Sequence, residues 1–377
     1  MTDVLPERRV QSPSDALPPL SAVMPVRNEE RHLAEAVSRV LEQEYPGEFE
    51  LILAVGPSRD QTMRIARSLE AADQRVRVLE NPTGKIPSAL NIAVSAARFE
   101  VVARIDGHAL LPPGYLVSAV RILLDSGAAD VGGIMAAEGE SDFQKAVAWA
   151  MTSPVGVGSA QFHTGGGAGP ALSVYLGVYR RSAVLAVGGW DEAMLVAEDW
   201  ELNYRIRSAD GLIWFDPSMR VTYRPRASLK ALGIQYFRYG RWRRVVARQY
   251  PDTVSVRYLA PPIAAALFVF GLVLGVAGLA AGLPWLALGF VLPGGYLLAV
   301  ILAGLGLPKS VSTGVRLRIP LVLAAMHLCW GSGFLTSPKR LARATRAGLP
   351  GSRAAVPTGS VDSALPPASP PPVTGPR

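Results

Sequence analysis

The chain has 377 residues, of which 49% are hydrophobic, and 38 Lys and Arg against 30 Asp and Glu give a formal net charge of +8. This length accommodates one domain of ordinary size together with further apolar segments. Many arginines precede a long apolar stretch, so the sequence favours anionic lipid as a partner and excludes nucleic acid. The single cysteine, Cys329, excludes an intrachain disulfide and agrees with a reducing compartment.

Both ends of the chain have the composition of disordered tails. Residues 1–19, and the basic and then Pro-rich residues 337–377, have little to bury. The first residues carry acids and prolines without a continuous apolar core, so no signal peptide is expected. We therefore expect the polar region before residue 258 to stay in the cytosol.

Between residues 20 and 106, short apolar runs alternate with amphipathic helical patterns. The pattern predicts strands over 20–26, 49–55, 76–81 and 100–106, and helices over 29–43, 60–72 and 86–97. Such regular alternation is typical of an α/β domain with a mostly parallel central sheet and helices on both faces. We assign this domain to residues 20–227.

Polar residues follow each predicted strand. In open parallel sheets, ligands bind outside the carboxyl ends of the strands, where these loops meet. The rule selects Asn28 and Glu29 after the first strand, Ser58 and Asp60 after the second, Lys85 after the third, and Asp106 and His108 after the fourth.

The region 258–336 is predicted to be a membrane region. Residues 259–283 and 284–307 carry no charge, and each is long enough to cross a bilayer. A weaker segment over 319–334 is open to three interpretations: a short span, a re-entrant hairpin or an interfacial helix. Six arginines between 238 and 257 precede the first span, which indicates that this side is cytosolic. The sequence therefore predicts a multi-pass protein of the plasma membrane.

The segment 228–257 mixes aromatic residues with arginines. This pattern is typical of an amphipathic helix that lies on a membrane surface, with Arg238, Arg243 and Arg244 mainly on lipid. By contrast, the glycine-rich run over 163–177 lacks the Lys-Ser/Thr ending of a phosphate loop. We therefore expect it to form a mobile loop that includes His163.

Six motifs in order resemble the inverting, family-two glycosyltransferases of the nucleotide-sugar-binding GT-A type. They are MPVRNEE (24–30), GPSRDQT (56–62), GKIPSALNIAV (84–94), RIDGH (104–108), VGGWDEAMLVAEDWELNYRI (187–206) and QYFRYGRWRR (235–244). The segment MHLCWGSGFL (326–335) further resembles bacterial exopolysaccharide enzymes of the succinoglycan glucosyltransferase type.

The resemblance implies a role for each matching residue. Asp199, with Glu198 beside it, matches the catalytic base motif. The implied nucleotide-sugar residues are Pro25, Asn28, Glu29, Ser58, Asp60, Lys85, Arg104 and Asp106. Those on the acceptor and diphosphate are Gly188, Gly189, Trp190, Gln235, Arg241 and Trp242. Asp106 and His108 would hold a divalent metal, Mn²⁺ or Mg²⁺.

Two positions depart from the family pattern. Val55 stands where the family has an aspartate that binds uracil, and His108 stands where it has the second aspartate of its metal motif. The resemblance still favours a UDP-sugar donor.

The expected function is inverting transfer of a single sugar to a lipid-linked acceptor, a saccharide on polyprenyl diphosphate. Processive polymer synthesis is less expected, because a translocating pore needs more spans. Two alternatives stay open: transfer to polyprenyl phosphate itself, and a non-catalytic scaffold that binds nucleotide or lipid.

Overall fold

The computed structural model describes residues 17–308 and 310–346. Within them, one sheet of eight strands has the order β3-β2-β1-β4-β7-β5-β8-β6. The strands are β1 (Leu20–Val26), β2 (Phe49–Val55), β3 (Val76–Glu80), β4 (Val101–Arg104), β5 (Asp130–Ala137), β6 (Gly169–Pro170), β7 (Tyr175–Arg180) and β8 (Ile213–Tyr223). Strands β1 to β4 are parallel, as are β5 and β8, whereas β7 and β6 are antiparallel to their neighbours. The predicted α/β class with a mostly parallel sheet is confirmed.

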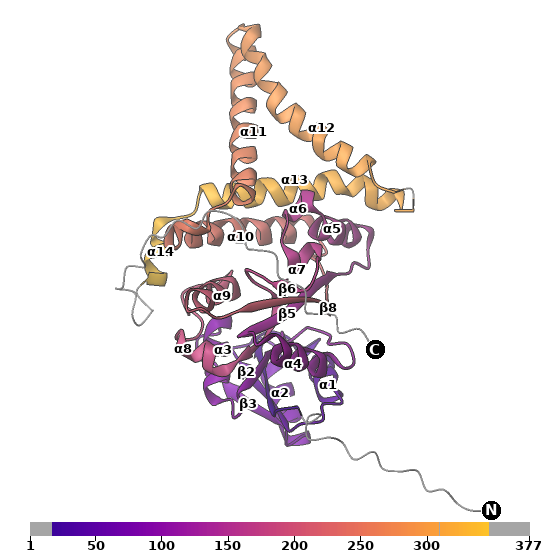
Figure 1. Cartoon of the computed structure of the whole chain (residues 1–377). Helices are drawn as coiled ribbons and strands as arrows, with labels where there is room; N and C mark the ends of the chain where they lie inside the picture. Colours follow the sequence, from indigo (N-terminus) through magenta and orange to yellow (C-terminus); the bar gives the residue numbers. More distant parts are fainter. Residues whose placement is uncertain (1–16, 309, 347–377) are drawn as a thin grey trace, which may run out of the picture.

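Helices cover both faces of this sheet (Figure 1). The core joins α1, α2 and α4 to one face and α3, α8 and α9 to the other. The α-helices are α1 (Leu33–Leu41), α2 (Thr62–Ala72), α3 (Ile86–Ala96), α4 (Tyr115–Ser126), α5 (Asp142–Thr152), α6 (Pro154–Val157), α7 (Gln161–Thr164), α8 (Arg181–Ala186), α9 (Glu198–Ser208), α10 (Leu229–Gln249), α11 (Val256–Ala280), α12 (Val291–Leu305), α13 (Thr313–Leu335) and α14 (Lys339–Arg346). Two 3₁₀ helices, η2 (Pro251–Thr253) and η3 (Pro284–Phe290), complete the set.

Strands β1 and β2 begin and end at the residues that the apolar runs predict. The first helix begins four residues later than predicted, at Leu33. The intervening residues are held in a loop by the chain after β2, because the N–H of Glu29 donates to Thr62 Oγ1 at 2.8 Å and that of Glu30 donates to Asp60 Oδ2 at 3.3 Å. The delay leaves residues 28–32 as a loop at the carboxyl end of β1. The glycine-rich run after α7 includes the edge strand β6 and the start of β7.

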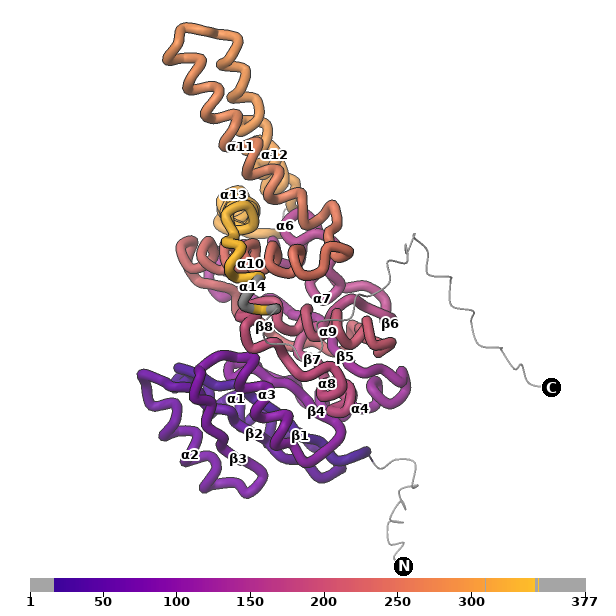
Figure 2. Tube along the Cα trace, turned by 90° about the vertical axis from the view of Figure 1, so that its left-hand side faces the viewer, coloured from indigo at the N-terminus to yellow at the C-terminus, as the bar shows by residue number. Residues whose placement is uncertain are grey.

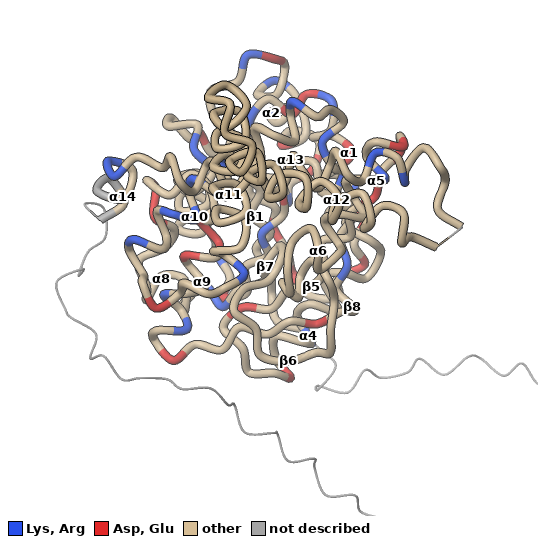
Figure 3. The backbone as a smooth tube through the Cα atoms, turned by 90° about the horizontal axis from the view of Figure 1, so that it is seen from above, with Lys and Arg blue, Asp and Glu red and all other residues tan. Residues whose placement is uncertain are grey.

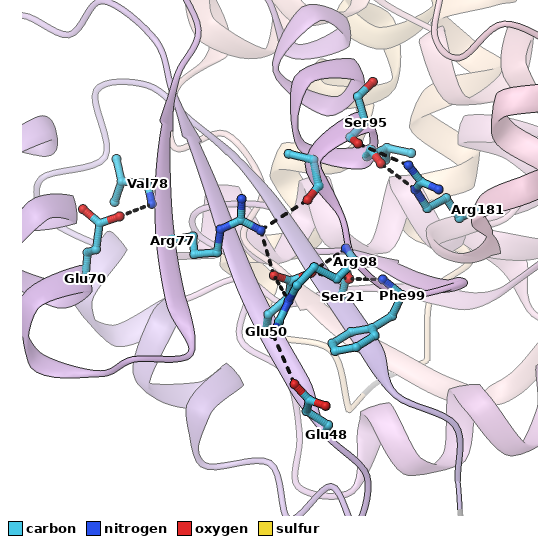
Figure 4. A network of polar contacts seen from close by, with 12 residues as sticks. Ser21, Glu48, Glu50, Glu70, Arg77, Val78, Ser95, Arg98, Phe99 and Arg181 are labelled. Carbon is cyan, nitrogen blue, oxygen red and sulfur yellow. Dashed lines mark hydrogen bonds and ion pairs between the residues drawn. The ribbon is translucent and has the colours of Figure 1, made fainter.

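The amino ends of the strands are held by a buried carboxylate, Glu50, whose side chain is 1% exposed. It accepts hydrogen bonds from Ser21 at 2.8 Å, from Arg77 at 3.0 Å, and from the backbone and side chain of Arg98 at 2.8 and 3.0 Å (Figure 4). Burial alone would raise the pKa of Glu50, but these hydrogen bonds lower it. The network ties three strands together at the edge opposite the predicted site.

Three helices are long and apolar enough to cross a membrane: α11, the η3–α12 segment, and α13. Helices α11 and α12 form a hairpin that stands away from the sheet (Figures 1 and 2). Seen from above, the hairpin is almost free of charged residues (Figure 3). This hairpin corresponds to the two predicted spans.

Helix α13 runs across the base of the hairpin and lies side by side with α10 (Figures 1 and 2). It is one continuous helix of 23 residues, so this segment is not a re-entrant hairpin. Glycines permit the close approach: a Cβ on Gly240 would lie 1.8 Å from the carbonyl oxygen of Trp330, and one on Gly333 would lie 2.0 Å from that of Phe237. The backbones of α10 and α13 are therefore in direct contact.

Helix α10 is covered by α13, whereas the sequence predicts that it lies on the membrane surface itself. Arg243, expected mainly on lipid, is 7% exposed. The difference arises because aromatic residues far away in the sequence, Trp200 and Tyr258, stack on its guanidinium.

Candidate active site

Two loops at the carboxyl ends of β1 and β2 hold each other through Asn28 and Ser58. The Asn28 backbone N–H donates to Ser58 Oγ at 3.1 Å, and Asn28 Oδ1 accepts from the N–H of Arg59 at 2.9 Å. Both residues were selected as nucleotide-sugar ligands, and both also shape the loop that carries Glu29.

Asp60 fixes the same loop from the other side. Its carboxylate accepts from the hydroxyl and N–H of Thr62 at 2.5 and 3.1 Å, and from the N–H of Glu30 at 3.3 Å. The hydrogen bond from the Thr62 hydroxyl leads the effects that lower the pKa of Asp60. Thr62 Oγ1 in turn accepts from the N–H of Glu29 at 2.8 Å. The carboxylate of Asp60 is therefore anionic and helps to position Glu29.

A pocket of about 110 Å³ opens between these loops. It brings together five residues that the sequence selected: Pro25, Glu29, Lys85, Asp106 and His108. Sequence reasoning missed two further polar lining residues, Arg27 and Asn81. Arg27 donates to the carbonyl oxygens of Pro57 at 3.3 Å and Gly84 at 3.1 Å, and so bridges two loops of the rim. The sequence held a usable signal for both residues. Arg27 directly follows β1 and Asn81 directly follows β3, and the rule that ligands bind at the carboxyl ends of strands selected their neighbours.

Asp106 and His108 lie on this pocket with Glu29. His108 Nδ1 is 3.0 Å from Glu29 Oε1, and this contact is the main cause of the raised pKa of His108. A carboxylate and an imidazole suit Mn²⁺, and Mg²⁺ accepts one or two carboxylates when phosphate oxygens and waters complete the shell. Among the described residues no group of three or more such side chains could hold a metal. Asp106 and His108 therefore fit a site that the substrate completes.

Arg104, at the end of β4, lies among three carboxylates and is 5% exposed. Its guanidinium is 3.2 Å from Asp106 Oδ1 and 3.5 Å from Glu198 Oε1, and it also pairs with Asp199. Burial opposes the charge of Arg104, but the three carboxylates raise its pKa well above the ordinary value. Arg104 was expected to bind nucleotide sugar; the structure has it joining the metal motif to the base motif.

The candidate base Asp199 is in the first turn of α9, after Ala197 with φ of 67°. The indole Nε1 of Trp190 donates to its Oδ1 at 3.0 Å. Trp190 is 2% exposed, so it lies in the core behind Asp199 and not on the open surface of the site.

Asn91 of α3 holds the backbone of Trp190. It accepts from the Trp190 N–H at 2.8 Å and donates to the Trp190 carbonyl oxygen at 2.9 Å. Gly189, with φ of 72°, makes this possible, because a Cβ there would lie 2.5 Å from Asn91 Oδ1. Gly188 has φ of 84° and belongs to the same turn.

The pKa of Glu198 is raised far above its ordinary value. Burial and, after it, the adjacent Asp199 raise its pKa to about 7, against a smaller opposing effect of Arg104. Glu198 is therefore partly protonated near neutral pH.

The three predicted residues of α10 have different environments. Gln235 donates to the hydroxyls of Tyr223 at 3.0 Å and Tyr239 at 2.8 Å. Trp242 is 6% exposed. It packs with hydrophobic residues that flank Asp199 in the sequence: Met194, Val196, Ala197 and Trp200. The guanidinium of Arg241 stacks on Phe237 at 4.7 Å. Trp242 thus supports the base segment from the membrane side.

Comparisons with known proteins identify the relatives of the chain. The family model described as glycosyl transferase family 2 matches residues 21–188. The succinoglycan biosynthesis protein ExoA of Rhizobium meliloti is 34% identical over 318 residues, covering 83% of this chain and 92% of that protein. A dolichyl N-acetyl-alpha-D-glucosaminyl phosphate 3-beta-D-2,3-diacetamido-2,3-dideoxy-beta-D-glucuronosyltransferase of Methanococcus voltae is 22% identical, over 59% of this chain and 71% of that one.

Among solved structures, the mannosyltransferase PcManGT of Pyrobaculum calidifontis, in complex with GDP-Man and Mn²⁺, has the same fold. Its TM-score is 0.53 at 20% identity, over 83% of this chain and 88% of that chain. The fold, the family match and the extended similarity to ExoA lead to one conclusion: the chain belongs to the family 2 glycosyltransferases.

Proposed function

We propose that the protein is an inverting, metal-dependent glycosyltransferase of exopolysaccharide biosynthesis. It transfers a single sugar from a nucleotide-diphosphate sugar to a lipid-linked saccharide at the cytosolic face of the plasma membrane. The observation that carries the proposal is the group of Asp106, Arg104 and Asp199. It sets a metal-motif carboxylate and a base-motif carboxylate on opposite sides of one buried guanidinium.

The donor side consists of the pocket with Lys85, Asp106 and His108. A divalent cation, when bound there, neutralises the charge that develops on the leaving diphosphate. PcManGT, which shares the fold, holds a nucleotide sugar and Mn²⁺. The family resemblance favours UDP. Val55, which stands where the family has a uracil-binding aspartate, is 1% exposed in β2 and offers no polar group to a base.

On the acceptor side, Asp199 accepts the proton of the attacking hydroxyl. Trp190 and Arg104 fix the direction of its carboxylate, and a positioned general base contributes about 10² to 10⁴ in rate. Attack from the side opposite the leaving diphosphate inverts the anomeric carbon. We assign Gly188, Gly189, Gln235, Arg241 and Trp242 to the same side, as the family resemblance implies.

The acceptor is proposed to be a saccharide on polyprenyl diphosphate. The apolar hairpin supports a membrane location, which brings the site near lipid. The name of the Methanococcus relative describes a sugar on dolichyl phosphate as its acceptor. ExoA is named for succinoglycan biosynthesis, which supports the assignment to an exopolysaccharide.

The test is sugar transfer by the detergent-solubilised protein with a panel of nucleotide sugars, Mg²⁺ or Mn²⁺, and a bacterial lipid extract. One donor should be consumed in a metal- and lipid-dependent manner, and Asp199→Asn should abolish turnover. The matched control is Asp210→Asn, an exposed carboxylate just beyond the end of the same helix. Its φ of 62° suits asparagine as well as aspartate.

Two outcomes would contradict the proposal. Transfer to added polyprenyl phosphate, but not to lipid-linked saccharides, would make the protein a polyprenyl-phosphate sugar transferase. Binding of nucleotide sugar with no turnover of any donor, and no effect of Asp199→Asn, would make it a non-catalytic scaffold.

A further inference from the structure

Three arginines from three helices meet at the root of the apolar hairpin. Arg207 is in α9, Arg243 is in α10, and Arg257 is in the first turn of α11. Helix α9 also carries the proposed base, and Trp200, the residue after Asp199, contacts this group. The arginines therefore lie between the base helix and the segment that leads to the membrane.

Aromatic rings, rather than carboxylates, enclose Arg243. Its guanidinium lies 4.6 Å from the ring centroid of Trp200 and 3.6 Å from that of Tyr258. One terminal nitrogen donates to the carbonyl oxygen of Thr253 at 2.5 Å and to its hydroxyl at 3.2 Å. The buried Nε has no hydrogen-bond partner among the described residues. Arg243 thus has a fixed orientation and unused hydrogen-bonding capacity.

The other two arginines approach the same aromatic cluster. Arg257 stacks on Tyr258 at 4.4 Å. Arg207 lies 5.6 Å from the ring centroid of Tyr204, which stacks on Trp200 with centroids 5.7 Å apart. Like the Nε of Arg243, the Nε of Arg207 is buried without a partner within residues 17–308 and 310–346.

No ion pair in the described part of the chain involves any of the three guanidiniums. Asp252 is close enough to favour the charge of Arg207 and Arg243, and its carboxylate accepts from the hydroxyl of Tyr204 at 2.9 Å, but this one negative charge does not balance three positive ones. His163 faces Arg257 from α7; burial and this arginine lower its pKa to about 4, so it is neutral. The group therefore carries excess positive charge.

Such a group is costly without a counter-ion, because burial penalises a charge that no opposite charge compensates. The pKa values agree: burial, and then charge repulsion from Arg257, lower that of Arg243 to about 10, and burial lowers that of Arg207. A phosphate would supply the missing charge, and the planar guanidinium fork matches its oxygens.

We propose that Arg207, Arg243 and Arg257 form a binding site for the phosphate groups of a membrane lipid. Two lipids offer this chemistry: the diphosphate of a lipid-linked acceptor and the headgroup of an anionic phospholipid. The first source rests on the proposed function and would hold the acceptor's diphosphate at the membrane side of the base helix, with the saccharide directed toward Asp199.

The experiment measures equilibrium binding of radiolabelled farnesyl diphosphate to the full chain in phosphatidylcholine nanodiscs. Farnesol, which has no phosphate, is the ligand control. The test variants are Arg243→Gln and the double variant Arg207→Gln with Arg257→Gln, which spares the buried residue. The matched control is Arg244→Gln. Arg244 follows Arg243 in α10 and carries the same charge, but its guanidinium stacks on Phe334 of α13.

We expect farnesyl diphosphate to bind and farnesol not to bind. Each test variant should raise the dissociation constant at least about tenfold, the effect of one lost charged hydrogen bond, and Arg244→Gln should change it less than about twofold. Competition by phosphatidylglycerol at comparable concentration would identify the phospholipid headgroup as the source. Resistance to this competition would identify the acceptor diphosphate.

Equal affinity in the test variants and the wild type, or an equal loss in Arg244→Gln, would overturn the site. Its failure can be told apart from that of the proposed function. Arginine-dependent binding without sugar transfer would retain the site and refute the transferase. Sugar transfer together with binding that does not depend on the arginines would retain the transferase and refute the site.

Discussion

Trp190 Nε1 donates a hydrogen bond to Oδ1 of Asp199 at 3.0 Å, and this indole is itself 2% exposed. The direction of the proposed base is therefore set from within the core. The edge-to-face contact of Trp190 with Tyr179, with centroids 5.6 Å apart, further restricts the ring.

Trp190→Phe should keep an aromatic ring at this place and remove the indole donor together with the volume of the second ring. Because a hydrogen bond to a charged group contributes about 1.5–3 kcal/mol, we expect kcat to fall by about 10- to 100-fold. The KM for the donor should change little, since Trp190 does not line the donor pocket. Steady-state kinetics of Trp190→Phe and of Trp285→Phe, an exposed tryptophan of η3, check this. A rise in KM with unchanged kcat would contradict it.

Arg104→Lys should retain the charge but lose the geometry, because an ammonium group cannot replace a guanidinium fork among three carboxylates. We expect a loss of kcat of at least about tenfold with a modest loss of stability. Arg104→Met should unfold far more easily, because removing one partner of a buried ion pair costs about 3–5 kcal/mol. Thermal unfolding and turnover test both, with Arg39→Lys on the exposed side of α1 as control. Full activity of Arg104→Lys would refute the bridging role.

Glu198 should make the stability of the protein depend on pH. Its pKa is raised to about 7 in the folded protein, so the folded state binds more protons than the unfolded state between about pH 4.5 and 7. The contribution of Glu198 is fully present below this window and is lost as the pH rises through it. Melting temperatures of wild type and Glu198→Gln, measured from pH 5 to 8, should therefore diverge toward higher pH, with the wild type falling faster.

Glu44→Gln, an exposed control, should run parallel to the wild type over the same range. The difference between variants is the relevant quantity, because the raised pKa of His108 adds its own dependence to every curve. Parallel curves for wild type and Glu198→Gln would show that Glu198 ionises normally.

Gly240→Leu should separate α10 from α13, since even a Cβ at this position would lie 1.8 Å from the carbonyl oxygen of Trp330. Overpacking of a close contact costs about 1–3 kcal/mol or more, so the melting temperature should fall by several degrees. Gly294→Leu in α12 is the matched control, because no atom of the described residues outside its own stretch of helix lies within 4 Å of its Cβ position. An unchanged melting temperature of Gly240→Leu would mean that the two helices do not dock as described.

His108→Asp should change the metal preference. Imidazole suits Mn²⁺ better than Mg²⁺, whereas a second carboxylate gives the oxygen ligands that Mg²⁺ prefers. The ratio of turnover with Mg²⁺ to that with Mn²⁺ should rise in the variant. His32→Asp, at an exposed histidine of the loop before α1, is the control. An unchanged ratio would exclude His108 from the metal site.

The donor half of the site could be predicted from sequence because it is local. Strands β1 and β2 are uninterrupted apolar runs, and the residues after each strand meet at one edge of a parallel sheet. The displaced start of α1 could not be predicted, since it depends on hydrogen bonds that the backbone N–H groups of residues 28–30 donate to Ser58, Asp60 and Thr62, about 30 residues away.

The positioning roles of Arg104 and Trp190 were equally inaccessible to sequence reasoning. The contact of Arg104 with Asp199 joins residues 95 positions apart, and that of Asn91 with Trp190 joins residues 99 apart. Motifs identified these residues as belonging to the site but carried no information on which of them touch. The burial of Arg243 has the same origin, because only tertiary packing brings Trp200 and Tyr258 onto it.

The division of the site along the chain has an evolutionary consequence. The donor pocket is built from residues 25–108, whereas the base and the membrane-side residues come from 188–258. Under the proposed function, exchange or drift of the later segment would change the acceptor without altering sugar-nucleotide selection. In a chimera of two relatives, a junction between residues 108 and 188 should recombine donor and acceptor preferences, provided that the parents share the carboxylates around Arg104.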